Sequence, residues 1–104
     1  MSKYVFVYRG GSGMAATPAE QQQVMAAWGA WYARLGAAIV DGGAPFGAST
    51  SVSSSGIGPA SSALGGYTVV TAPSIEAASA LTDGCPVMAD GGSVDIYDCV
   101  EMGA

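Results

Sequence analysis

Apolar residues alternate along residues 3–9 with the two-residue period of a β-strand. Tyr4, Phe6 and Tyr8 fall on one face of this strand, and two valines and Arg9 fall on the other. Both faces are mostly apolar, and strands of this kind are usually covered on both sides. We therefore expect the strand to have structure packed on each face.

The apolar spacing becomes helical after Thr17. A proline follows this threonine directly, and Glu20 lies three residues beyond it, so the segment has the N-cap, the first-turn proline and the capping box of a helix start. Apolar side chains then recur every three or four residues as far as Leu35, and Gly36 is suited to end the helix.

The rest of the chain predicts three more strands and a second helix. The strands are expected at residues 38–41, ended by two glycines, at residues 67–72 and at residues 93–102. Ser74 is the expected N-cap of the second helix, which Gly84 and Pro86 stop. Residues 48–63 are rich in Ser, Gly and Ala and predict a loop, with residues 51–53 as a short edge strand.

This order of elements predicts a single α+β domain over residues 1–104. Two helices on one face of an antiparallel sheet form the split βαβ, ferredoxin-like arrangement. The other face of the sheet would stay open, although residues 3–9 are apolar on both sides. We therefore expect a homodimer that packs through its sheets.

Composition excludes several classes of function. The chain has a net charge of −5 and only three scattered cations, which argues against binding of nucleic acid or of an anionic membrane surface. No apolar run reaches the about 20 residues of a membrane span, and the N-terminus has no signal-peptide pattern. We expect a cytoplasmic protein.

The chain also contains no histidine, the residue that most acid–base and metal chemistry near neutral pH uses. Cys85 and Cys99 lack metal-ligand spacing and are expected to be small buried thiols, so we expect no metal. Residues 11–16 match the glycine pattern of dinucleotide sites, but the helix is expected to begin only after them. We expect a plain glycine loop and no cofactor.

Three polar residues are candidates for a catalytic site. Arg9 ends the first strand and is suited either to bind a substrate carboxylate or to form a structural ion pair. Asp41 ends the second strand, where it is either a buried general base or a turn residue before Gly42. Tyr8 would donate a hydrogen bond to the same substrate.

Four aromatic residues are candidates for a ligand pocket. Trp28, Trp31 and Tyr32 lie on one stripe of the first helix, and Tyr67 begins the strand at residues 67–72. Large aromatic side chains supply most of the burial in a small domain, so core packing is the simpler interpretation. The alternative is the wall of a small-molecule pocket.

Five short motifs follow one another in the second half: GP at 58–59, LGGYTVV at 64–70, SIEAA at 74–78, CP at 85–86 and GSVDI at 92–96. With the first strand, the proline–glutamate helix start and VDG at 40–42, they resemble the YCII-related family, and its DGPF-type branch most closely. The resemblance implies a dimeric ferredoxin-like fold. It also implies, for some members, a His–Asp pair in a cleft that acts on small organic molecules.

Asp41 matches the acid of that pair, but no residue can replace the histidine, and the DGPF segment is reduced to Gly58-Pro59-Ala60. Some DGPF-type members are associated with extracytoplasmic sigma factors, which suggests a regulatory or accessory role. Three functions stay open: a small-molecule binding or accessory protein, a lyase- or isomerase-type enzyme that uses Asp41 as base, and a structural or interaction dimer.

Overall fold

The computed structural model describes residues 1–10, 17–60, 63–89 and 91–102, so the glycine motif at residues 11–16 lies outside the described residues. The strands are β1 (Ser2–Arg9), β2 (Ile39–Pro45), β3 (Ser51–Ser53), β4 (Gly56–Gly58), β5 (Leu64–Ala72) and β6 (Ser93–Asp98). The helices are α1 (Pro18–Leu35), α2 (Ile75–Leu81) and α3 (Pro86–Ala89), with a 3₁₀ turn at Gly36–Ala38.

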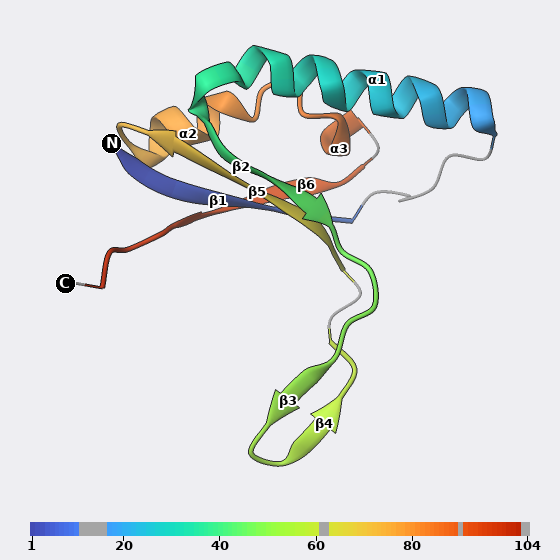
Figure 1. The fold of residues 1–104 in the computed structure, drawn as a ribbon, viewed down its shortest axis with the longest axis vertical. Helices are drawn as coiled ribbons and strands as arrows, with labels where there is room; N and C mark the ends of the chain where they lie inside the picture. Colours follow the sequence, from blue (N-terminus) through green and yellow to red (C-terminus); the bar gives the residue numbers. More distant parts are fainter. Residues whose placement is uncertain (11–16, 61–62, 90, 103–104) are drawn as a thin grey trace.

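The fold is α+β, as predicted, and is built on an antiparallel sheet. Four strands pair in the order β2-β5-β1-β6, and every neighbouring pair is antiparallel. The helices lie on one side of this sheet, and the first turns of α1 extend beyond the strands (Figure 1). The part of the chain that the structure describes contains no helix long and apolar enough to cross a membrane.

Both helix starts and the end of α1 form as the sequence predicts, whereas α2 ends at Leu81, before Gly84. The Thr17 hydroxyl accepts a hydrogen bond from the Glu20 amide at 3.1 Å, and the Ser74 hydroxyl accepts one from the Ala77 amide at 3.1 Å. Gly36 ends α1 with a positive φ of 52° and donates its amide to the Tyr32 carbonyl. Each contact satisfies a backbone group that the first or last turn leaves without a partner.

The core lies between the helices and one face of the sheet. Phe6, Trp31, Thr68 and Val70 are its largest fully buried side chains. The alternation predicted for β1 is confirmed: its tyrosines and phenylalanine are buried against the helices, and its two valines lie half-buried on the other face. We call that other face, which no described helix covers, the open face (Figure 1).

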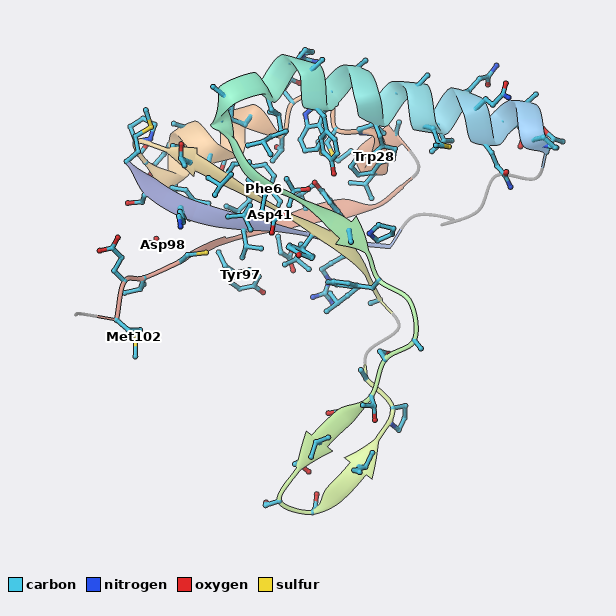
Figure 2. The ribbon with its side chains drawn as sticks, viewed as in Figure 1. Phe6, Trp28, Asp41, Tyr97, Asp98 and Met102 are labelled. Carbon is cyan, nitrogen blue, oxygen red and sulfur yellow. The ribbon has the colours of Figure 1, made fainter. Side chains whose placement is uncertain are left out.

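Three strand boundaries differ from the prediction, and the first is the start of β5, which lies at Leu64 instead of Tyr67. β2 does not stop at its glycines but continues to Pro45, because Gly43 forms an irregularity with φ +72° and the strand resumes its pairing with β5. β6 ends at Asp98 instead of residue 102: Asp98 pairs with Tyr4, and the Cys99 amide makes one further bond to β1, to the Lys3 carbonyl at 2.9 Å. Met102 therefore points into solvent and is 92% exposed (Figure 2).

A β-strand forms at Ser51–Ser53, as proposed, but it pairs with β4 in a separate two-stranded sheet. This hairpin projects away from the four-stranded sheet, on the side opposite the helices (Figure 1). The radius of gyration is 15.2 Å, against about 13 Å for a compact domain of this length. The hairpin is thus an arm outside the main core.

Candidate functional site

A cleft of about 1010 Å³ opens between α1, α3 and the adjoining ends of β2 and β5. The overhang of α1 creates it, since the first half of this helix extends past the strands that support its second half (Figure 1). Val24 and Met25 line the cleft and stay exposed although both are apolar. Exposed apolar side chains gathered in a concavity are typical of a binding site.

Three hydroxyl groups meet at the base of the cleft, and we call them the hydroxyl cluster: Tyr8, Tyr32 and Thr68. The Thr68 oxygen lies 2.7 Å from the Tyr8 oxygen and 3.0 Å from the Tyr32 oxygen. The Tyr32 hydroxyl donates to the Gly42 carbonyl at 3.1 Å, and the Thr68 oxygen lies 3.2 Å from the same carbonyl oxygen. Tyr8 and Tyr32 line the cleft, while Thr68 lies fully buried behind them.

Strand alternation and one glycine bring this cluster together. Tyr8 and Thr68 lie on the helix-covered faces of neighbouring strands, and Tyr32 reaches them from α1. The irregularity at Gly43 lets the chain turn so that the Gly42 carbonyl points at two of the hydroxyls. The buried Tyr8 and Thr68 hydroxyls need partners, and the neighbouring hydroxyls and the Gly42 carbonyl supply them.

Counting protons indicates what the cluster offers to a ligand. Each hydroxyl has one proton to donate, and the Gly42 carbonyl can only accept. If Thr68 donates to Gly42 or Tyr32, Tyr8 donates to Thr68 and keeps its lone pairs free. If Thr68 donates to Tyr8, the Tyr8 proton is free instead. Tyr8, which lines the cleft, therefore has either an acceptor or a donor left over after its bond to Thr68.

The Tyr8 phenol stays protonated near neutral pH. Burial raises its pKa well above the usual value, and the nearby Tyr32 acts in the same direction, against a smaller opposite effect of the Thr68 hydrogen bond. A phenol with such a pKa is a poor proton-transfer group at pH 7. The geometry therefore suits Tyr8 for hydrogen bonding and not for acid–base catalysis.

Aromatic rings form the wall next to the hydroxyl cluster. The Trp28 ring meets the Tyr8 ring edge to face, with centroids 5.0 Å apart, and meets the Tyr32 ring with centroids 6.1 Å apart. Figure 2 places Trp28 between α1 and the sheet. Rings held by several edge-to-face contacts have little freedom, so this wall is preorganised.

The other two aromatic candidates have different surroundings. Trp31 is 2% exposed, does not line the cleft, and donates its indole proton to the Leu81 carbonyl at 3.0 Å, which is the behaviour of a core residue. Tyr67 borders the cleft where β5 begins, and its ring stacks on Phe46 with centroids 6.0 Å apart.

The structure does not bring the three catalytic candidates together. Tyr8 and Arg9 are consecutive in β1, so their side chains lie on opposite faces of the sheet. Arg9 forms an ion pair with Asp95 at 3.2 Å, and both side chains are partly exposed on the open face. This geometry matches the structural ion pair that the sequence left as an alternative.

Asp41 is exposed and does not line the cleft. Its carboxylate accepts a hydrogen bond from the Gly43 amide at 2.9 Å, two residues along the chain. This is the local turn contact that aspartate commonly makes, and it matches the turn alternative and not the buried base.

Thr68 and the Gly42 carbonyl were not among the sequence candidates. The sequence contains one signal for Thr68: it is a threonine beside valines, on a strand whose alternate positions face the core. A hydroxyl buried there must find a hydrogen-bond partner. The sequence contains no signal for the Gly42 carbonyl, since the direction of this carbonyl depends on the irregularity at Gly43.

The cysteines and acids add no second site. Cys85 is buried and burial raises the pKa of its thiol, whereas Cys99 is exposed, contrary to prediction, because it follows the last strand. Within the described ranges, no three acidic or cysteine side chains are close enough to hold a metal ion.

The chain matches no family model and no curated protein. The resemblance to the YCII-related family therefore stays a prediction.

Proposed function

We propose that the protein binds a small organic molecule in the cleft beneath α1. The observation that carries this proposal is a concavity of about 1010 Å³ lined by Trp28 and by two members of the hydroxyl cluster, Tyr8 and Tyr32. Few oriented polar groups in a mainly apolar cleft are the usual composition of a ligand site.

Binding is better supported than catalysis. A general base needs a pKa near the working pH, and the chain has no histidine to supply one. Asp41 lies outside the cleft, and burial raises the pKa of Tyr8 away from neutrality. The lyase or isomerase alternative would need these groups around one substrate.

Two fluorescent probes test the proposal: uncharged N-phenyl-1-naphthylamine and anionic 1-anilinonaphthalene-8-sulfonate. We expect at least one to bind with a dissociation constant in the micromolar range. Ala27→Trp should weaken that binding about tenfold or more, because Ala27 lines the cleft and an indole there would take up part of the space for the probe.

Ala26→Trp is the matched control, because Ala26 lies on the same helix and does not line the cleft. The Ala26→Trp variant should bind the probe with the same affinity as the unmodified protein. If neither probe binds, or if both variants bind alike, the cleft is not a ligand site. If the protein is a dimer and binds neither probe, the structural or interaction alternative is favoured.

The proposed fold is the ferredoxin-like arrangement. Its support is the strand order β2-β5-β1-β6, together with α1 between β1 and β2 and with α2 and α3 between β5 and β6. This is the connectivity of a split βαβ fold with the hairpin inserted between its second and third strands.

We also propose that a second copy of the chain covers the open face. Val5, Val7 and Val69 lie half-buried there in the single chain. The charged residues that strand pairing places on this face are two cations and two acids, Lys3, Arg9, Asp41 and Asp95. The charges of these four residues cancel, although the whole chain has a net charge of −5. Two copies can therefore approach through this face without strong repulsion.

The hairpin projects on the same side and adds apolar surface. Val52 and Ile57 face each other across it and are 71% and 78% exposed. An isolated two-stranded hairpin is marginally stable in water, so contact with a second copy would stabilise it. The chain also has no charged residue from 42 to 75 to protect these strand edges.

We expect light scattering to give the mass of a dimer, and Val69→Lys to give a monomer, because it places a charge in the middle of the apolar face. Ala33→Lys, on exposed helix surface, should leave the dimer intact. A monomer mass for the unmodified chain would contradict the proposal, and so would a dimer of Val69→Lys.

A further inference from the structure

We propose that the cleft selects an uncharged, mainly aromatic ligand that carries one hydroxyl or carbonyl group, and that this group hydrogen-bonds to Tyr8. The inference rests on the proposed function and names the class of ligand. It is carried by three features of the cleft: its charges, its aromatic wall and the position of its polar group.

The charges of the cleft disfavour an anion. None of the three cations of the chain is among the described residues that line it. Glu20 is the one charged side chain among those residues, and the whole chain carries −5. A carboxylate or phosphate that left water for this cleft would find no compensating charge and would meet a negative potential. Arg9 lies on the open face and does not line the cleft, so it is not placed to bind a carboxylate there.

The negative potential of the cleft attracts a cation, but the ring arrangement works against one. A cation is best bound over the exposed face of an aromatic ring. Trp28 already makes T-shaped contacts with Tyr8, Trp31 and Tyr32, at interplanar angles of 75°, 79° and 68°. Its remaining surface suits a flat apolar partner better than an ammonium group, which would have to give up its hydration shell.

Tyr8 supplies a polar contact for a ligand. Thr68 and the Gly42 carbonyl are occupied within the hydroxyl cluster, so Tyr8 is its terminal member. Its hydroxyl can donate to a carbonyl or accept from a hydroxyl, depending on which way the Thr68 proton points. A ligand with one such group satisfies Tyr8 and places its rings against Trp28.

Isothermal titration with a matched naphthalene series tests the inference at neutral pH. We expect 2-naphthol to bind at least about tenfold more tightly than 2-naphthoate or 2-naphthylmethylammonium. Tyr8→Phe should weaken 2-naphthol binding about three- to tenfold and leave the affinity for naphthalene unchanged, because it removes one hydrogen bond and keeps the ring.

Tyr8→Phe should fold, since Thr68 keeps its contacts with Tyr32 and Gly42. Ala27→Trp is a second test, because it should weaken the binding of 2-naphthol and of naphthalene alike, about tenfold or more.

Equal or tighter binding of either ion would overturn the ligand class, and so would a failure of 2-naphthol to bind. An unchanged 2-naphthol affinity in Tyr8→Phe would overturn the hydrogen bond. In all these cases the proposed function survives if a fluorescent probe still binds the unmodified cleft and if Ala27→Trp weakens that binding. If no probe and no naphthalene binds, both proposals fail together.

Discussion

Replacing Gly43 by alanine is expected to lower the free energy of unfolding by about 3–5 kcal/mol, or to prevent folding. A Cβ atom at this position would lie 1.7 Å from the Tyr67 carbonyl oxygen and 2.6 Å from its carbon. The φ of +72° is also one that side chains rarely adopt. Since the obstacle is backbone in the neighbouring strand, β2 has to leave its pairing with β5.

Gly42→Ala is the matched control. A Cβ atom there would meet nothing within 4 Å, so we expect a change below about 0.5 kcal/mol. Denaturant titration of the two variants measures the difference. Equal stability of the two variants would show that the irregularity in β2 is easily rearranged. The hydroxyl cluster, which depends on the Gly42 carbonyl, would then not be fixed by it.

Replacing Trp31 by alanine should cost about 3–5 kcal/mol, a large part of the stability of a domain this size. The side chain is 2% exposed and stacks near Phe6, with ring centroids 6.3 Å apart. Its indole proton also satisfies the Leu81 carbonyl at the end of α2. The substitution leaves a cavity under α1 and an unsatisfied carbonyl.

Trp31→Phe separates these two effects, since it keeps most of the ring and removes the hydrogen bond. We expect it to cost roughly 1–2 kcal/mol in thermal or denaturant unfolding. A loss below 1 kcal/mol for Trp31→Ala would contradict the core role. Trp31 would then have to be reconsidered as part of the cleft wall, next to Trp28.

Local signals predicted the helix ends because their physics is local. Thr17 and Ser74 cap the helices through atoms three residues away, so the sequence contains the whole interaction. α3 was missed because its four residues are too few for a helical period.

The glycines of β2 were misinterpreted for a different reason. Paired glycines occur both where a strand ends and where it bulges, and only the partner strand distinguishes the two. The sequence does not contain the register of β5 against β2, which places the Tyr67 carbonyl against Gly43.

Part of the candidate site can be predicted from the sequence. Tyr8, Trp28 and Tyr32 line the cleft because strand and helix periods had already placed them toward the core. Arg9 and Tyr8 were joined in one catalytic hypothesis although the period of a strand separates consecutive side chains. The sequence itself places the Tyr8 and Arg9 side chains on opposite faces of the strand, which argues against that hypothesis.

The arm formed by β3 and β4 leaves and re-enters the sheet at a single point. The Phe46 amide donates to the Gly65 carbonyl at 2.9 Å, and Pro45 pairs with Gly66, so the chain closes on itself before the arm begins. Changes in length beyond that closure leave the register of β2 and β5 untouched and add little loop entropy. The arm is a module that evolution or an engineer can lengthen, shorten or exchange while the cleft stays as it is.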